Sequence, residues 1–136
     1  MLKTTFFPEH FIWVAHPKSA KITLDDVTHG DAIFVSGLLM NPEFIRTLTG
    51  RYVPFTAAVA RNYRRGERGR GKKKTLLLEP HPGGMVLGTM LLKLTQGNKD
   101  ALDKFEQIPQ GIRRKAPIRV TIGAYERTAT TFLLNE

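Results

Sequence analysis

The sequence has no cysteine and no long apolar run, and both absences narrow what the protein can be. Without cysteine, the chain cannot form disulfides or hold a metal through thiolates. No apolar segment approaches the roughly 20 residues that a membrane-spanning helix needs. Pro8 interrupts residues 1–9 before they could form the hydrophobic region of a secretory signal. We therefore expect a soluble, cytoplasmic protein.

The basic charge is concentrated in one segment. The 136 residues carry a formal net charge of +9, and 41% of them are hydrophobic, which is enough for one domain with a sizeable core. Between positions 61 and 74, eight basic residues stand against one acid, Glu67, so this segment accounts for +7 of the net charge. The eight are Arg61, Arg64, Arg65, Arg68, Arg70, Lys72, Lys73 and Lys74. An anionic partner would therefore bind this segment rather than the chain as a whole.

The domain is expected to begin at a strand that ends in a glycine. Residues 1–31 are interpreted as an N-terminal extension, and residues 32–136 as one domain. Residues 32–36 have the composition of a buried strand and run into Gly37. A glycine in this place lets the backbone approach a ligand closely and leaves its N–H groups free to donate. The turn is either an ordinary strand-to-helix connection or the floor of a pocket.

Local signals predict a helix and a strand after this turn. Asn41 is suited to the N-cap, Pro42 to the first helical position and Glu43 to the first turn. Gly50 can end the helix. The next segment alternates as a half-buried strand does, with its apolar face formed by Val53, Phe55, Ala57 and Val59.

The middle of the chain is predicted to be a loop followed by a hairpin. Residues 64–74 are rich in Gly, Arg and Lys, so we expect them to form a mobile loop. Residues 75–78 and 85–94 then read as two strands that turn at Pro80-His81-Pro82-Gly83-Gly84.

A second helix is predicted from Asn98, as its N-cap, to Ile108, before Pro109. At 100° per residue, Glu106 lies about 40° beyond Leu102, at the border of the buried face. Its carboxylate is therefore either half-solvated or held in a cleft. Strands over residues 118–122 and 128–134 complete an α+β domain of short antiparallel strands with two short helices, which could close as a small barrel.

Three motifs in this order resemble the AIG2-like gamma-glutamylcyclotransferase family. Residues 34–40 (FVSGLLM) resemble its phenylalanine-valine-tyrosine-glycine-threonine-leucine-methionine opening, and residues 82–88 (PGGMVLG) resemble its glycine-rich strand. Residues 101–106 (ALDKFE) match its leucine-aspartate-x-phenylalanine/tyrosine-glutamate motif. Tyr63-Arg64-Arg65 falls where members tend to have a tyrosine-arginine pair. The resemblance extends over about residues 31–134.

The resemblance implies a small mixed β-barrel with short helices packed on it, and release of 5-oxoproline from a small-molecule gamma-glutamyl substrate. It implies Glu106 as the catalytic general acid and base, and Ser36, Gly37, Leu38 and Leu39 as the substrate-binding loop. No metal or organic cofactor is implied. One carboxylate with a raised pKa could take a proton from the substrate's ammonium and return it to the leaving amine.

The chain departs from the family's pattern at three positions. Ser36 replaces the usual tyrosine, and Leu38 replaces threonine or serine. The later tyrosine-x-arginine motif corresponds to Ile112-Arg113-Arg114, which keeps the arginine and loses the tyrosine. If backbone N–H groups bind the substrate, the first two departures are tolerated; if the side chains do, recognition is weakened.

Other functions stay open at this point. The protein could be a non-catalytic member whose basic segment 61–74 binds nucleic acid or another polyanion, with Glu106 an ordinary helix residue. A membrane role is disfavoured because no amphipathic helix adjoins that segment. Ser36 is not expected to be a nucleophile, since no histidine is placed to activate it. The histidines lack metal-ligand spacing and are interpreted as structural: His10, His16, His29 and His81.

Overall fold

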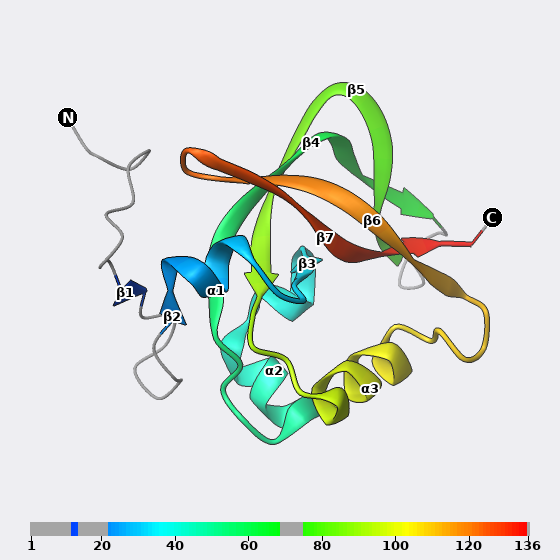
Figure 1. The fold of residues 1–136 in the computed structure, drawn as a ribbon. Helices are drawn as coiled ribbons and strands as arrows, with labels where there is room; N and C mark the ends of the chain where they lie inside the picture. Colours follow the sequence, from blue (N-terminus) through cyan, green and yellow to red (C-terminus); the bar gives the residue numbers. More distant parts are fainter. Residues whose placement is uncertain (1–11, 14–21, 69–74, 136) are drawn as a thin grey trace.

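The structure is a computed structural model that describes residues 12–13, 22–68 and 75–135. Five strands close into a barrel in the order β3-β5-β4-β6-β7 (Figure 1). Their bounds are β3 Ile33–Val35, β4 Phe55–Arg68, β5 Thr75–Leu91, β6 Arg113–Ile122 and β7 Tyr125–Leu134. Neighbouring strands are antiparallel except β3 and β7, which run parallel. The small mixed barrel inferred from the sequence is therefore confirmed.

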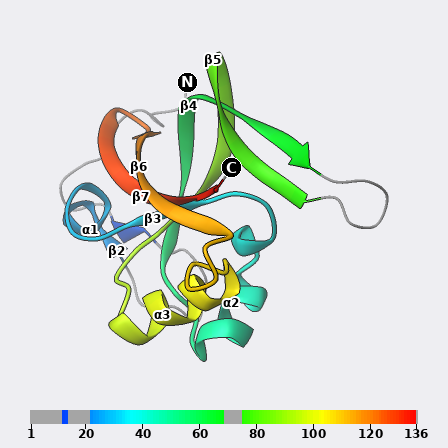
Figure 2. The same cartoon turned by 90° about the vertical axis from the view of Figure 1, so that its right-hand side faces the viewer.

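Two helices lie side by side beneath one end of the barrel, in both Figure 1 and Figure 2. They are α2, Pro42–Thr49, and α3, Gln96–Phe105. The rings of Phe44 and Phe105 meet edge to face with centroids 5.2 Å apart. The guanidinium of Arg51 donates to Asn98 Oδ1 at 2.9 Å and so joins the end of α2 to the start of α3. These contacts fix the position of the C-terminal end of α3.

The first of these helices forms as its local signals predict. The Asn41 side chain accepts from the backbone N–H groups of Glu43 and Phe44, at 2.9 and 3.4 Å. Pro42 occupies the first turn, and Gly50 ends the helix with φ +85°. Because the left-handed region is cheap only for glycine, Gly50 sets where the chain turns back toward β4.

The second helix begins earlier than predicted. Thr95, not Asn98, is the N-cap: its hydroxyl accepts from the N–H of Asn98, while the Asn98 side chain accepts from the N–H of Thr95. This reciprocal pair satisfies two N–H groups, which is more than Asn98 alone could do. The helix ends at Phe105, and Glu106 is its C-cap.

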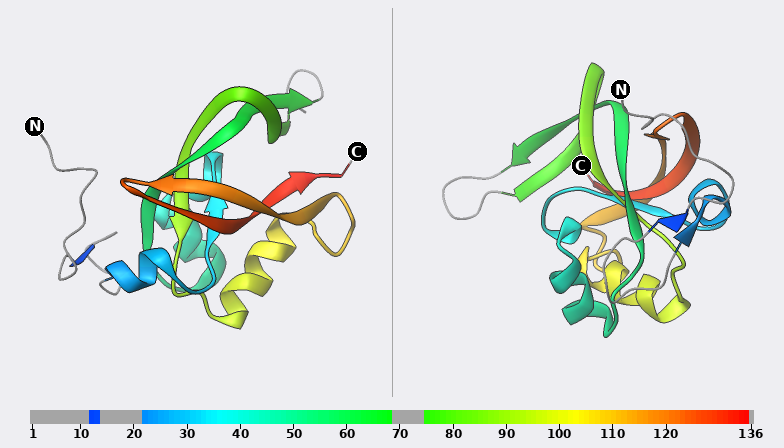
Figure 3. Two further views of the ribbon diagram at one scale, coloured as in Figure 1. Left: turned by 45° about the horizontal axis from the view of Figure 1, so that its top comes forward. Right: turned by 90° about the vertical axis from the view of Figure 1, so that its left-hand side faces the viewer.

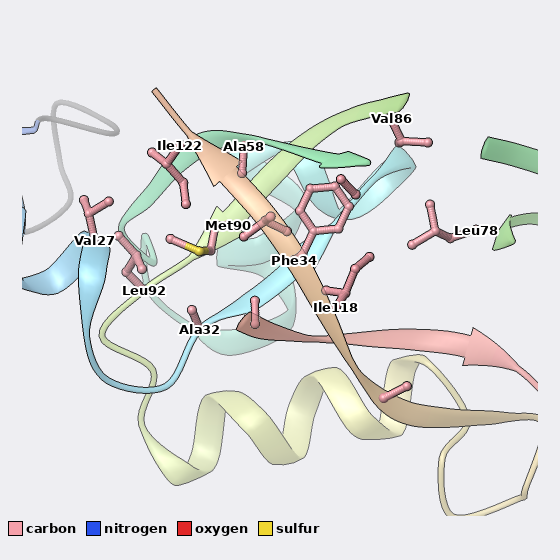
Figure 4. Close-up of a cluster of buried hydrophobic side chains, with 14 of the residues drawn as sticks. Val27, Ala32, Phe34, Ala58, Leu78, Val86, Met90, Leu92, Ile118 and Ile122 are labelled. Carbon is pink, nitrogen blue, oxygen red and sulfur yellow. The ribbon is translucent and has the colours of Figure 1, made fainter. Parts of the chain in front are cut away.

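A closely packed core fills the barrel around the ring of Phe34 on β3 (Figure 4). A Cβ on Gly88 of β5 would lie 2.5 Å from the Phe34 Cζ and 2.5 Å from the Val35 carbonyl oxygen. Glycine is therefore required at this point of β5, beside the paired strand β3. A second cluster, which includes Val35, Leu39 and Leu102, packs the outside of the barrel against the helices.

The buried face of β4 differs from the prediction. The buried side chains in this strand are Thr56, Ala58 and Ala60, not the predicted Phe55, Ala57 and Val59. Small residues point inward because the narrow barrel is already filled by larger side chains such as Phe34 and Met90. The larger residues of β4 therefore occupy its outer face, the opposite of what the alternation of apolar residues predicts.

The predicted hairpin in the middle of the chain is wrong, and so is the predicted start of the loop at residue 64. β5 is one strand that pairs along its length with β4, and residues 81–84 form an irregularity inside it rather than the turn of a hairpin. Asn62, with φ +68°, accepts there from the N–H of Gly83 at 3.1 Å. Residues 64–68, predicted to be part of a mobile loop, are the last part of β4. The rest of that predicted loop, residues 69–74, lies outside the described residues.

A short segment before the barrel packs onto it, as Figure 3 shows. It contains β2, Ile22–Thr23, paired with β1, Ile12–Trp13, and the helix α1, Leu24–Thr28. Ile22 and Val27 are fully buried in the barrel core. The predicted strand around residues 11–15 is described only at 12–13. The boundary after residue 31 stays a prediction.

Candidate functional site

A cavity of about 530 Å³ opens at the end of the barrel where β3 leads into the helices. The turn after β3 contributes Ser36, Gly37, Leu38 and Leu39 to its wall, and the end of α3 contributes Glu106. The five residues proposed from the sequence therefore surround one cavity, although Gly37 and Glu106 are far apart in the chain.

The turn after β3 is a 3₁₀-helix, η1, Gly37–Met40. Ser36 is extended, and Gly37 has φ +80°, a conformation that side chains disfavour. The first N–H groups of such a helix have no acceptor within it, and the Ser36 side chain does not cap them. Leu39 is buried in the second apolar cluster and anchors the turn. The turn thus presents backbone donors at the cavity wall.

Glu106 also lies in the wall of this cavity, with its side chain only 15% exposed. Its backbone N–H donates to the Leu102 carbonyl at 2.9 Å, which fixes the carboxylate at the end of α3. Burial raises the pKa of Glu106, while the neighbouring Arg113 opposes this rise. The helical spacing allowed the Glu106 carboxylate to be either half-solvated or held in a cleft. The structure shows that it is held in a cleft.

Sequence reasoning missed Arg113, which forms an ion pair with Glu106. The Arg113 Nε lies 3.3 Å from the Glu106 Oε2, and the Arg113 side chain is 17% exposed. The family motif matched its arginine to Arg114. Arg114 is exposed instead. No local pattern distinguishes the two arginines, because only the position of Glu106 in space selects between them.

The basic segment is partly a strand, and its charges point in different directions. The described basic residues of this segment all belong to β4, whose end projects with β5 from the barrel (Figure 2). We call these projecting ends of β4 and β5, residues 63–68 and 75–80, the arm. The Arg64 Nε lies 2.6 Å from the Glu79 Oε2 on β5. Arg65 lines the cavity. Arg70, Lys72, Lys73 and Lys74 lie outside the described residues.

A second, shallower hollow of about 450 Å³ lies beside the start of β3. Its charged side chains already have partners: Asp31 pairs with Lys99 at 2.5 Å and Lys115 with Asp103 at 2.7 Å. Arg127 donates to the carbonyl oxygens of the α1 end and the turn after it. These groups hold the barrel and its preceding segment together, so this hollow is not the candidate site.

Two features are absent from the residues that the structure describes. Within them, no group of three or more histidine, aspartate and glutamate side chains is arranged to hold a metal ion. No helix among the described elements has the length and apolar character needed to cross a membrane.

Solved structures share this fold at low sequence identity. A solution structure of an Arabidopsis thaliana protein is 19% identical, with a TM-score of 0.65, and the match covers 76% of this chain and 68% of that one. A structure named gamma-glutamyl cyclotransferase is 16% identical, with a TM-score of 0.66 and coverage of 78% and 67%. An uncharacterized Homo sapiens protein has the same TM-score and coverage at 18% identity.

No curated protein matches the sequence. The model of the family described as "Gamma-glutamyl cyclotransferase, AIG2-like" matches residues 33–136, which include the whole barrel, the turn after β3 and Glu106. Because this match spans most of the sequence, the chain belongs to the AIG2-like gamma-glutamyl cyclotransferase family.

Proposed function

We propose that the protein releases 5-oxoproline from a gamma-glutamyl compound, with Glu106 as general acid and base. The observation that carries the proposal is that Glu106 and the turn over residues 36–39 line one cavity. A carboxylate for proton transfer and donors for a developing oxyanion are the two groups that such a cyclisation needs. The family match supports this chemistry at the level of the family.

The reaction is an internal displacement at the substrate's γ-carbonyl carbon. The ionised Glu106 takes a proton from the substrate's α-ammonium, and the resulting amine attacks the γ-carbonyl. A bond forms between the α-nitrogen and the γ-carbon, and the bond from that carbon to the leaving amine breaks. Glu106 then gives its proton to the leaving amine. The second proton that the α-nitrogen loses on becoming the lactam N–H passes through the same carboxylate to the leaving amine. The products are therefore 5-oxoproline and the protonated amine, and the carboxylate is regenerated.

The environment of Glu106 suits both proton transfers. Burial raises its pKa, which makes the carboxylate a better base than one in water. Arg113 opposes this rise and so keeps a larger fraction ionised in the free protein. The balance between these two effects lets one side chain accept a proton and then donate it.

The oxyanion that develops at the γ-carbonyl would accept from the backbone N–H groups of Gly37 and Leu38, which have no acceptor within η1. These donors depend on the backbone of η1 and not on its side chains. The replacement of the family's usual tyrosine by Ser36, and of threonine or serine by Leu38, is then tolerated. Consistent with a minor role for its side chain, Leu38 is 56% exposed at the rim.

The test is release of 5-oxoproline from a panel of gamma-glutamyl amino acids and gamma-glutamyl amines. We expect Glu106→Gln to lower the rate by about 10²- to 10⁴-fold, the usual contribution of general acid–base catalysis. Glu126→Gln, which changes an exposed glutamate on β7, is the matched control and should keep the wild-type rate. Equal rates for wild type and Glu106→Gln would remove the role assigned to Glu106.

A second candidate function is binding of a polyanion, such as nucleic acid, by the arm and the basic residues between its two strands. The favouring observation is that Arg61, Arg64 and Arg65 are exposed on β4, at or near the projecting arm. Replacing the arginines and lysines of residues 61–74 with serine should then reduce both the affinity for nucleic acid and its dependence on salt. An unchanged salt dependence would reject this candidate.

A further inference from the structure

The cavity has two arginines for one carboxylate. Arg65, Glu106 and Arg113 are the charged residues in its wall. Arg113 pairs with Glu106 at 3.3 Å. Arg65 has no carboxylate partner in the described part of the chain, and its Nη2 lies 3.7 Å from the Sδ of Met40. The arm therefore brings one uncompensated cation to the mouth of the cavity.

The pairing of β4 with β5 determines that it is Arg65, rather than Arg64, that reaches the cavity. Arg65 pairs with Leu78, and Arg64 pairs with Glu79. Residues paired across antiparallel strands project to the same face, so Arg65 shares a face with Leu78, which belongs to the barrel core. Arg64 is held on the other face by its ion pair with Glu79. The direction of Arg65 is thus built into the sheet.

The two arginines have different neighbours in the cavity wall. Arg113 is beside Glu106, which would bind the substrate's α-ammonium. Because the ammonium and the α-carboxylate are bonded to the same carbon, Arg113 is the cation available to that carboxylate. Arg65 lies by Met40, the last residue of η1, whereas the free N–H groups are at its start. A second anionic group, on the leaving side of the γ-carbonyl, would suit Arg65.

We propose that Arg65 binds a carboxylate carried by the leaving amine, so that the protein selects gamma-glutamyl amino acids over gamma-glutamyl alkylamines. This inference rests on the proposed function, which it extends to the leaving group. A gamma-glutamyl amino acid has two carboxylates and one ammonium, hence one net negative charge. A gamma-glutamyl alkylamine has none. The excess positive charge of the cavity wall matches the first class.

The experiment uses binding, so that it does not depend on turnover. Gamma-glutamylglycine and its C-terminal amide are titrated by calorimetry into full-length Glu106→Gln, which retains the cavity but lacks the proposed base. We expect the amide to bind about 3- to 10-fold more weakly, the effect of one partly exposed charge-assisted contact. When Arg65→Gln is added to Glu106→Gln, the ratio of the two dissociation constants should fall close to one. When Arg65→Lys is added instead, part of the preference for the acid should return.

Arg61→Gln in the same background is the matched control, because Arg61 is an exposed arginine of the same strand that does not line the cavity. It should leave the ratio unchanged. Equal affinity for the acid and the amide, a ratio that survives Arg65→Gln, or absence of binding by both ligands would each overturn the inference. Failure of the proposed function is a different result: wild-type protein that releases no 5-oxoproline from any member of the panel.

Discussion

The smallest unit that explains the site is the pair of Glu106 and Arg113. Desolvation disfavours the ionised carboxylate, whereas the guanidinium at 3.3 Å favours it. The first effect is the larger, so the pKa of Glu106 stays above its ordinary value of 4.5. A change at either residue should therefore be visible in the dependence of activity on pH.

Replacing Arg113 should move the acidic limb of the activity profile. In Arg113→Gln the effect that lowers the pKa of Glu106 is lost, so the pKa rises further. The free protein then needs a higher pH to ionise its base, and the acidic limb of kcat/KM for 5-oxoproline release should shift to higher pH. Arg114→Gln, which changes the exposed neighbour, is the control and should leave the limb in place. A limb that moves to lower pH in Arg113→Gln would contradict the assigned electrostatics.

Gln107 is a residue under backbone strain at the cavity wall. It follows Glu106 with φ +59°, in the left-handed region that glycine adopts at lower cost. This conformation belongs to the end of α3, where the N–H of Ile108 donates to the Asp103 carbonyl oxygen at 3.0 Å. Because Gln107 also lines the cavity, its carboxamide is a candidate contact for the substrate.

Two variants of Gln107 separate the strain from the side chain. Gln107→Gly removes both, and Gln107→Ala removes only the side chain. We expect the glycine variant to be more stable than the alanine variant by about 1 kcal/mol, the cost of a left-handed residue with a Cβ. Urea denaturation measures this difference, while a KM raised equally in both variants would reveal the substrate contact. Equal stabilities would show that φ +59° is unstrained here.

At the scale of the elements, the close packing of β3 against its neighbour β5 fixes where η1 begins. Phe34 packs over Gly88, and the next residues lead into the cavity wall. A methyl group on Gly88 would force this contact apart, and the backbone of Val35 would have to move with it. The position of the backbone donors in η1 therefore depends on a glycine that lies outside the cavity lining.

Gly88→Ala should destabilise the protein by about 1–3 kcal/mol, as overpacking of a well-filled core does. It should also lower activity, since the strand that leads into η1 is displaced. Gly97→Ala is the matched control: its Cβ would have no atom nearer than 3.8 Å, and it lies inside α3. That variant should be more stable than wild type by about 0.5–1 kcal/mol. Thermal melts of both proteins provide the comparison, and a stable Gly88→Ala would refute the packing argument.

The elements also show what sequence could predict. The first long helix was predicted correctly because Asn41, Pro42 and Gly50 act within a few residues of one another. The sequence wrongly predicted two strands in place of β5, because residues 80–84 have the local composition of a turn. Only pairing with β4, including the Asn62–Gly83 contact, keeps them in the strand. Local signals thus suffice where the determining contacts are local.

The same distinction holds for the site. The family motifs identified Glu106 and residues 36–39, which do surround one cavity. Arg65 and Arg113 were not predicted as cavity residues, because their directions depend on strand register and on the end of the barrel. Side chains that reach a site from two separate strands require the three-dimensional structure.

For the whole molecule, the buried carboxylate has a consequence for stability. The folded protein holds the proton of Glu106 more tightly than the unfolded chain does, because burial raises the pKa only in the fold. The stability that the protonated group contributes is present below the ordinary pKa of 4.5 and is lost as pH rises through the folded pKa. At neutral pH the ionised Glu106 therefore lowers the stability of the folded protein. Residues at functional sites commonly lower stability in this way.

Glu106→Gln should remove this pH dependence, since glutamine stays neutral. We expect the variant to be more stable than wild type at pH 8, and the gain to shrink toward zero as pH falls below 4.5. Urea denaturation of both proteins across this pH range measures the difference, with Glu126→Gln as the exposed control that should show no such trend. If Glu106→Gln lost both activity and stability at pH 8, the ion pair with Arg113 would stabilise the ionised Glu106 by more than desolvation destabilises it. Glu106 would then be a structural residue of the helix end, and loss of activity alone could not establish it as the catalytic group.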